Sequence, residues 1–233
     1  MRKGSKSDKP ASLGRVMKIK WPNRNNGALT MIEVLVIVFG LFVVCFFLLL
    51  FSQPCHAGRK ARTIQCTYNL KQIGIAARNF ASEHNGKFPM EISVQDGGTK
   101  DVANFGIVTP HFLVMAYDLA TPKVLHCPFD ERPVATNFTE LRDINLSYFV
   151  GLDSRSNAPP TLFSGDRNVT NEGAEDSRIL ELTTNQPVAW TGALHGRTGN
   201  VLLSDGSVQG LTSFTLRGLL RDTGLATNRI AVP

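Results

Sequence analysis

The chain has 233 residues and a formal net charge of +6, a balance that can indicate a nucleic-acid partner. Residues 1–28, however, carry eight Lys or Arg and one Asp, whereas residues 52–233 carry 17 basic and 17 acidic residues. The positive charge therefore belongs to the N-terminal segment, and we expect no nucleic-acid partner. The residues beyond position 52 have the length of one domain.

An uncharged apolar run, Val34 to Phe51, follows the basic segment. These 18 residues, extended by Leu29 to Ile32, are long enough as a helix to cross the roughly 30 Å hydrocarbon core of a bilayer. A basic flank before the helix and a neutral domain after it predict a single-pass protein of the inner membrane. The N-terminus would lie in the cytoplasm and the domain in the periplasm.

Two other export signals fit the sequence less well. A secretory signal peptide has an apolar region of about 7–15 residues before a small-residue cleavage site. Here the run is longer, and Cys55-His56-Ala57 follows it. A lipoprotein signal needs a small residue before its cysteine, where this chain has Pro54. We therefore expect the mature protein to keep the apolar helix.

The apolar run begins with the motif Gly-Ala-Leu-Thr-Met-Ile-Glu at residues 27–33. The motif resembles the class III leader of type IV pilins and type II secretion pseudopilins. In that family a prepilin peptidase cuts before the apolar helix and methylates the new N-terminus. Cleavage after Ala28 would make Leu29 the first residue and Glu33 the fifth, as in the family. Cleavage after Gly27 would make Glu33 the sixth, and both bonds remain candidates.

Glu33 is the one charged residue in the apolar segment 29–52. A carboxylate at the edge of a membrane helix is costly unless a partner meets it. In a fibre of packed helices, Glu33 would pair with the new α-amine of a neighbouring subunit, and the pair would favour one axial register. The alternative is a side chain that lies in the lipid headgroup region.

Helical periodicity resumes after Gln53-Pro54, where proline can kink the chain. From Arg59 to His84, apolar residues recur at steps of mostly three to five, which predicts an amphipathic continuation of the helix over residues 53–86. Asn85-Gly86 is a typical helix end. The apolar residues of this predicted face are Ile64, Tyr68, Ile73, Ala77 and Phe80.

The remaining residues predict a mixed domain. Residues 90–135 are irregular apart from a short apolar helix around Phe112 to Leu119, and residues 151–178 are rich in loop-forming residues. A final short helix over Phe214 to Leu220 is expected to cover the sheet. Strands are predicted at Ile144–Val150, Thr161–Ser164 and Pro187–Thr191.

The strongest local pattern in the domain runs from Asn200 to Gly210. Two short apolar runs flank Asp205-Gly206, a pair that suits the positive φ angles of a type I′ turn. The pattern therefore predicts an antiparallel hairpin.

Three of the four cysteines lie in the exported part, where disulfides persist, and Cys45 lies in the apolar helix. A bond between Cys66 and Cys127 would tie the second helix to the middle of the domain and leave Cys55 unpaired. Connectivity does not follow from sequence, so this pair stays a hypothesis. The cysteine spacing contains no Cys-x-x-Cys and no zinc pattern.

His195 is separated by nine residues from Asp205-Gly206. This signature, together with the segments Cys66–Gly74 and Asn85–Pro89, resembles the large-insert pseudopilins common in planctomycete and verrucomicrobial genomes. A catalytic His–Asp pair would also need a nucleophile in a suitable context, and no Gly-x-Ser-x-Gly motif is present. The turn explains Asp205, and packing or capping in a Gly-rich loop explains His195.

Major pseudopilins similar to this chain can hold calcium in a loop near the C-terminus. The sequence has no EF-hand spacing, and polar loops contain oxygen ligands without binding metal. We therefore expect no cofactor, with a calcium loop at Asp153 and Asp166 as the alternative. The oxygen ligands available for calcium are Asp153, Asp166, Asn168, Asp176 and Asp205.

Together these features predict an α+β fold in which a long N-terminal helix, half transmembrane and half amphipathic, packs on a small antiparallel sheet. The expected parts are a leader (1–28), a transmembrane and polymerisation helix (29–52), its amphipathic continuation (53–86) and an extracytoplasmic domain (87–233).

The resemblance implies a structural subunit and not an enzyme: a pseudopilin or minor pilin of a type II secretion pseudopilus or a type IV pilus-like fibre. Its partners would be the prepilin peptidase, other pseudopilins in a homo- or heteropolymer, and an inner-membrane assembly platform. A first alternative is a membrane-anchored binding domain whose loops, residues 90–135 and 151–178, recognise a glycan or a protein. A second is an anchored hydrolase that uses His195 and Asp205.

Overall fold

The structure, a computed structural model, divides into two compact units, Met1–Gln53 and Pro54–Pro233. The leader, the candidate cleavage bonds on either side of Ala28 and the kink expected at Gln53-Pro54 lie outside the described residues. The structure describes residues 30–51, 56–156, 160–171 and 177–233.

The first unit contains the apolar helix α1 (Met31–Phe51). It begins with a capping box, in which Glu33 Oε2 accepts hydrogen bonds from the backbone N–H and the hydroxyl of Thr30, both at 2.8 Å. The Glu33 N–H donates to Thr30 Oγ1 at 3.4 Å. The window Met31–Leu49 is long and apolar enough to cross a membrane, as an anchor or as a signal sequence, and none of it is buried.

The second unit begins with helix α2 (His56–Glu83), which packs one face against the sheet. Leu70, Ile73 and Phe80 on this face are at most 4% exposed. The prediction was wrong for Ile64 and Tyr68, which are 59% and 60% exposed. At about 100° per residue these two side chains lie on the opposite side of the helix from Ile73. Apolar residues occur on both sides of α2, so periodicity alone selected the wrong set.

Helix α2 is followed by the expected break at Asn85 and Gly86, whose φ angles are 55° and 75°. The predicted apolar helix at residues 112–119 is two short helices, because Met115 (φ −103°, ψ 13°) interrupts it. The short elements between α2 and the sheet are η1 (Pro89–Glu91), η2 (Val94–Asp96), η3 (Lys100–Phe105), α3 (Thr109–Leu113), α4 (Ala116–Leu119), η4 (Pro122–Leu125) and η5 (Asp143–Asn145).

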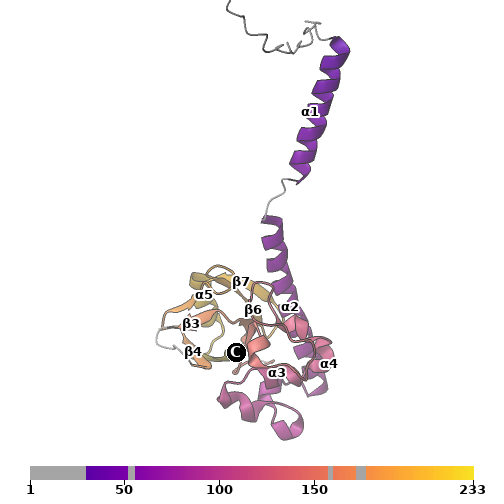
Figure 1. Ribbon diagram of the computed structural model, residues 1–233. Helices are drawn as coiled ribbons and strands as arrows, with labels where there is room; N and C mark the ends of the chain where they lie inside the picture. Colours follow the sequence, from indigo (N-terminus) through magenta and orange to yellow (C-terminus); the bar gives the residue numbers. More distant parts are fainter. Residues whose placement is uncertain (1–29, 52–55, 157–159, 172–176) are drawn as a thin grey trace, which may run out of the picture. The chain divides into compact units, whose positions relative to one another are not determined.

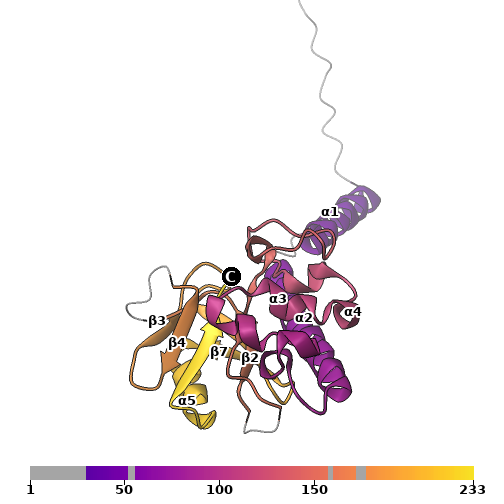
Figure 2. The ribbon, with the colours of Figure 1, turned by 90° about the horizontal axis from the view of Figure 1, so that it is seen from below.

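The fold is α+β, with a six-stranded antiparallel sheet in the order β4-β8-β1-β2-β6-β7 and a separate pair, β3-β5. Figures 1 and 2 show α2 on one side of the domain and β3, β4 and α5 on the other. The elements of the sheets and the last helix are β1 (Tyr148–Gly151), β2 (Leu162–Asp166), β3 (Val169–Asn171), β4 (Ile179–Thr183), β5 (Val188–Trp190), β6 (Thr198–Leu203), β7 (Val208–Thr212), α5 (Ser213–Asp222) and β8 (Thr227–Ala231).

Both faces of the sheet are covered. Along β1, Tyr148 and Val150 belong to the core cluster that contains the buried face of α2, whereas Phe149 belongs to a second cluster with α5, β3 and β5. A strand buried on both faces reads as a continuous apolar run, and all four residues of β1 are buried. This explains why strict alternation of apolar and polar residues was a poor guide to these strands.

The strand predictions were correct in part. β2, β5 and α5 lie within a few residues of their predicted positions, but β1 begins at Tyr148 because η5 occupies the expected start of the strand. β3 lies in the segment predicted as loop, and β4 and β8 were not predicted.

The β6–β7 hairpin is confirmed, but its predicted turn type is wrong. In the described loop only Gly206 has a positive φ, 79°, whereas a type I′ turn needs a positive φ at Asp205 as well. The Gly206 N–H donates to Leu203 O at 2.8 Å, and the Leu203 N–H donates to Ser207 O at 2.9 Å. The loop is therefore a turn followed by a left-handed glycine, the typical three-residue hairpin connection.

His111 of α3 is buried, with 1% of its surface exposed. Its Nδ1 lies 2.7 Å from Thr99 Oγ1, and its Nε2 has no hydrogen-bond partner among the described residues. Burial lowers the pKa of His111 to about 4, although the charge of Asp143 opposes the shift. The imidazole is therefore neutral in the folded protein at neutral pH.

We predict that the two sides of α2 differ in their response to the same substitution. Ile73→Ala should lower the free energy of unfolding by about 2–5 kcal/mol, because Ile73 is fully buried. Ile75→Ala, the matched control at a side chain that is 59% exposed, should change it by less than about 0.5 kcal/mol. Urea unfolding followed by circular dichroism measures both, and equal losses would contradict the packing described.

We predict that the domain loses stability as the pH falls from about 6.5 to 4. The unfolded chain takes up a proton on His111 near pH 6.5, whereas the folded protein resists it until about pH 4. The contribution of neutral His111 to the stability of the domain is therefore complete above the pKa of the unfolded chain, near 6.5. It is lost as the pH falls through the pKa of the folded protein, about 4. Urea unfolding from pH 4 to 7 should show a weaker pH dependence for His111→Gln than for the wild type, and identical slopes would contradict this assignment.

Candidate functional site

A disulfide joins α2 to the loop that follows η4. Cys66 and Cys127, 61 positions apart in sequence, have their Cα atoms 5.3 Å apart, and both residues are fully buried. This is the pair that was considered as a hypothesis from the sequence. Cys45 in α1 is a free thiol, and Cys55 lies outside the described residues. Because disulfides persist in oxidising compartments, the bond is consistent with an exported domain.

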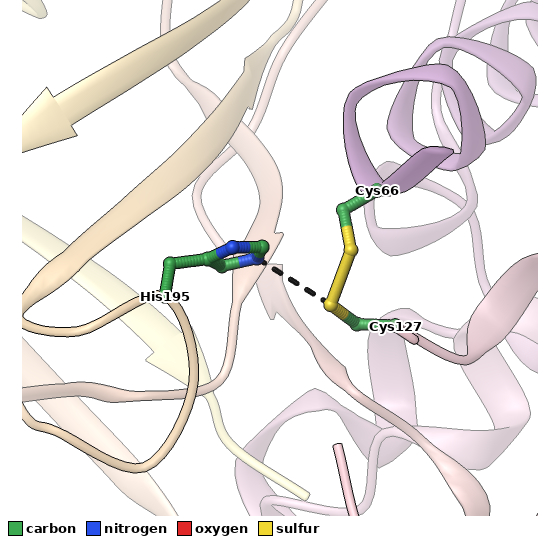
Figure 3. Close-up of side chains that lie close together, drawn as sticks. All are labelled: Cys66, Cys127 and His195. Carbon is green, nitrogen blue, oxygen red and sulfur yellow. Dashed lines mark hydrogen bonds between the residues drawn. A yellow bond between two sulfur atoms is a disulfide. The ribbon is translucent and has the colours of Figure 1, made fainter. Parts of the chain in front are cut away.

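His195 lies beside this disulfide (Figure 3). It comes from the loop between β5 and β6, where Gly196 and Arg197 have positive φ angles of 66° and 68°. Its Nε2 lies 3.4 Å from Cys127 Sγ, and its ring meets the edge of Phe129 at a centroid distance of 4.6 Å. Only 5% of the His195 side chain is exposed. The loop thus places an imidazole against the sulfur from the side opposite α2.

Asp166, at the end of β2, is the carboxylate partner of His195. Its Oδ2 lies 3.3 Å from His195 Nε2, and the carboxylate is fully buried. The same oxygen accepts hydrogen bonds from the backbone N–H and the side-chain Nδ2 of Asn200, at 2.6 and 2.8 Å. Asp166 Oδ1 is buried without a hydrogen-bond partner among the described residues. Oδ2 of Asp166 therefore accepts two hydrogen bonds, whereas Oδ1 accepts none from the described residues.

Tyr148 lies beside this carboxylate, because β1 pairs with β2 in a register that sets Tyr148 opposite Asp166. Burial, and then the charge of Asp166, raise the pKa of the Tyr148 hydroxyl above its usual range, so it stays neutral. From α2, Asn69 Nδ2 donates to the carbonyl of His126 at 2.9 Å and to the Tyr148 hydroxyl at 3.4 Å. These polar contacts join α2, β1 and the Cys127 loop around the disulfide.

A second carboxylate fixes the loop that carries Cys127. Asp130 forms a bidentate pair with Arg167, with bonds of 2.7 and 2.8 Å, and its N–H donates to the Cys127 carbonyl at 2.8 Å. Burial raises the pKa of Asp130, but the hydrogen bonds and charge of Arg167 and a hydrogen bond from the Arg132 N–H lower it by more, so that it lies below its usual range. Arg167 follows Asp166, so the end of β2 holds both the His195 loop and the Cys127 loop.

This cluster does not have the geometry of a catalytic Cys-His-Asp relay. In a relay one imidazole nitrogen faces the nucleophile and the other is held by the carboxylate. Here Cys127 Sγ and Asp166 Oδ2 both lie near the same nitrogen, Nε2. What the arrangement does is hold the imidazole between a sulfur of the disulfide and a buried carboxylate.

A cavity of about 530 Å³ adjoins the cluster. β6 and β7 form one wall, and Thr63 on α2 and the Phe129 ring lie at the other side. His195, Asn200 and three threonines bring polar groups into a lining that also contains Phe129, Leu194 and Leu211. The buried cluster therefore borders a space large enough for solvent or a small molecule.

The two parts of the His-x9-Asp-Gly signature do not come together. His195 precedes β6 and Asp205 follows it, and a six-residue strand alone covers roughly 20 Å. Asp205 accepts a hydrogen bond from the Ser207 N–H at 2.8 Å, and its carbonyl accepts one from the Arg78 guanidinium on α2. A Cβ on Gly206 would collide with Arg78. The Asp-Gly pair thus shapes the hairpin and docks it on α2, and the hydrolase alternative lacks its proposed His–Asp contact.

The calcium candidates have protein partners in separate places. Asp153 forms a bidentate pair with Arg229, with bonds of 2.7–3.3 Å, on the β8 side of the domain. Asn168 Nδ2 donates to the carbonyls of Thr191 and Thr198. Asp176 lies outside the described residues, and a calcium loop remains a prediction. The one group of three His, Cys, Asp or Glu side chains with metal-ligand spacing found among the described residues is Cys66, Cys127 and His195.

Sequence reasoning missed the pairing of His195 with Asp166 and the contribution of Asn200. These residues lie 29 and 5 positions from His195, and no spacing rule links them. The one signal in the sequence was a buried-strand pattern that ends in Asp166. A carboxylate at the end of an apolar run needs a partner, but the partner follows from the pairing of β2 with β6.

We predict that the Cys66→Ser, Cys127→Ser double variant loses about 4 kcal/mol of unfolding free energy, the chain-entropy estimate for a loop of this length. Urea unfolding of the oxidised wild type and the double variant measures the loss. Cys45→Ser is the matched control and should change the stability of the domain by less than about 0.5 kcal/mol, because Cys45 lies in the separate unit. A double variant as stable as the wild type would show that the bond is not formed.

Comparison with known proteins finds a similarity over part of the chain. No curated protein and no solved structure matches the chain. Residues 56–148, which run from the start of α2 to the first residue of β1 and include both disulfide cysteines, match one family model. This segment, about two fifths of the chain, is similar to the family described as "protein of unknown function (DUF1559)".

Proposed function

We propose that this chain is a structural pilin-like subunit, a pseudopilin or minor pilin. A prepilin peptidase would remove residues 1–28, and residues 29–52 would anchor the protein in the inner membrane with the N-terminus in the cytoplasm. The periplasmic domain would then enter a type II secretion pseudopilus or a type IV pilus-like fibre with other pseudopilins, at an assembly platform. The family match and the apolar helix support a membrane-anchored or pilin-like protein, and the leader motif supports the finer proposal.

The observation that carries the proposal is helix α1, in which no described side chain is buried. Apolar helices of this kind need lipid or other helices around them. In the membrane α1 would lie in lipid, and in a fibre the helices of neighbouring subunits would replace the lipid. One helix can serve both states because its apolar surface extends around the whole circumference.

Helix α2 adds a second apolar surface. Ile64, Tyr68 and Ile75 are each about 60% exposed and, at spacings of four and seven residues, lie on one side of the helix. They lie opposite the face that packs on the sheet. A lone globular domain gains nothing from this stripe, whereas packing between subunits would bury it.

Glu33 has a local role that is compatible with assembly. Its carboxylate caps α1 through Thr30, and Glu33 remains exposed. A carboxylate has room for further donors beyond these two bonds. The α-amine released by cleavage before Ala28 or Leu29 would be such a donor when it comes from a neighbouring subunit.

A specific observation favours the alternative, a membrane-anchored binding domain. A cleft of about 720 Å³ lies between the two loop regions expected to bind a ligand, with Lys100 and Asn104 on one side and Asp153 and Arg155 on the other. Lys87 adds a positive charge and Glu91 and Asp101 add negative ones, while Arg229 is paired with Asp153, so the lining carries charges of both signs. In this alternative the leader would stay attached, and the cleft would recognise a polar ligand such as a glycan.

We predict that, in cells with an active prepilin peptidase, the mature protein begins at residue 28 or 29 with a methylated amine. N-terminal mass analysis of the membrane fraction measures this. A protein that starts beyond residue 52 would contradict the proposal and indicate a cleaved signal peptide. An intact N-terminus would favour the anchored binding domain.

Assembly can be tested separately with Glu33→Gln, which should be processed normally but be lost from sheared and pelleted fibres. Glu131→Gln, an exposed carboxylate of the domain, is the control and should pellet like the wild type. Normal pelleting of Glu33→Gln would instead indicate that the carboxylate of the wild-type Glu33 lies in the lipid headgroup region.

A further inference from the structure

Three metal-ligand atoms meet next to the sheet. The sulfurs of Cys66 and Cys127 and the Nε2 of His195 all lie within 4.8 Å of one another. All three residues are nearly or fully buried, and they come from α2, the loop after η4 and the loop before β6. In the oxidised protein the sulfurs are bonded to each other. The chain is synthesised with both cysteines as thiols, so a state without this bond precedes the disulfide.

The spacing suits a tetrahedral metal ion. With Zn–N of about 2.0 Å, Zn–S of about 2.3 Å and tetrahedral angles, two neighbouring N and S ligands lie roughly 3.5 Å apart. Cys127 Sγ and His195 Nε2 are 3.4 Å apart. Opening the S–S bond requires only small side-chain rotations to bring the two sulfurs to their own tetrahedral separation of roughly 3.8 Å.

A fourth oxygen ligand is within reach. Asp166 Oδ2 lies 3.3 Å from the same Nε2, close to the separation of roughly 3.3 Å expected for N and O ligands of one zinc ion. Asp166 Oδ1 is fully buried and has no hydrogen-bond partner among the described residues. The carboxylate can therefore complete the coordination or hold a zinc-bound water with its free oxygen.

The surroundings allow a metal ion to enter, and the two thiolates balance its charge. The cavity of about 530 Å³ is lined by His195, which gives an approach to the cluster. Two thiolates and Zn²⁺ together carry no net charge, so zinc binding adds no net charge to that of the buried Asp166 carboxylate and costs less than the burial of an isolated ion. Two soft thiolates and an imidazole favour Zn²⁺ over Mg²⁺ or Ca²⁺.

From this geometry we propose that the reduced protein binds one Zn²⁺ through Cys66, Cys127 and His195, with Asp166 or a water in the fourth position. Binding releases one proton from each thiol. An external disulfide later oxidises the two thiolates to the Cys66–Cys127 bond and frees the zinc. The external disulfide is itself reduced to two thiolates, which take up two protons from the solvent to become thiols. The zinc form and the disulfide form exclude each other. This proposal does not depend on the assembly of the chain into a fibre.

The test uses the full chain in detergent, with Cys45→Ala and Cys55→Ser, so that only the two cysteines of the site remain. The protein is reduced with dithiothreitol, freed of it without air and titrated with Zn²⁺ against a chromophoric chelator. We expect one tightly held zinc per reduced chain and none per oxidised chain. Co²⁺ in place of zinc should give the visible spectrum of a tetrahedral thiolate site. Failure of this reduced two-cysteine protein to bind zinc would overturn the proposal.

Variants distinguish this site from simple thiol chelation. His195→Ala should weaken zinc binding more than Asp166→Asn, for which the expected loss is about 10–100-fold. His84→Gln, at a half-buried histidine that follows α2 and stacks on Phe80, should leave zinc binding unchanged. Because unfolded thiols also bind zinc, thermal unfolding of the reduced protein is compared with zinc and with chelator. A raised midpoint with zinc is expected. No rise, or equal affinity in His195→Ala, would overturn the proposal even if the reduced chain is only marginally folded.

Discussion

The fold depends on the burial of one face of α2 against the sheet. Leu70, Ile73 and Phe80 belong to the same core cluster as Tyr148 of β1 and Leu202 of β6, and each is at most 4% exposed. Without this helix, that face of the sheet would present its apolar side chains to water. The disulfide and the Arg78 bond to the hairpin then fasten α2 at two points along its length. The hydrophobic face provides the main driving force, and the two links fix the register of the helix on the sheet.

A polar cluster around Asp166 lies inside this interface, and its hydrogen bonds offset the cost of burying a charge. An isolated buried carboxylate is strongly unfavourable, so Asp166 must be met by donors. β6 supplies Asn200, and the loop before β6 supplies His195. The next residue, Arg167, neutralises Asp130 and so fixes the loop that carries Cys127. The end of β2 thus fixes the positions of two loops around one disulfide. A set of metal ligands requires side chains that are held in this way.

The two helices differ in what surrounds them. One side of α2 is buried by its own domain, whereas Ile64, Tyr68 and Ile75 face outward, and no described side chain of α1 is buried at all. A protein that only needed to fold as a soluble domain would have polar residues at these places. The distribution is compatible with a pilin-like or membrane-anchored protein.

The sequence alone predicted an element correctly where a single local pattern determines it and no alternative packing competes. The length of the apolar run predicts α1, Asn85-Gly86 predicts the end of α2, and Asp205-Gly206 between apolar runs predicts the hairpin. Periodicity failed on α2, because both sides of that helix carry apolar residues and only packing decides which side is buried. The strands around β1 were hard to delimit because both faces of the sheet are covered. The pairing of His195 with Asp166, 29 positions away, was decided by the tertiary structure, since only the alignment of β2 with β6 brings a loop histidine to a buried carboxylate and the disulfide.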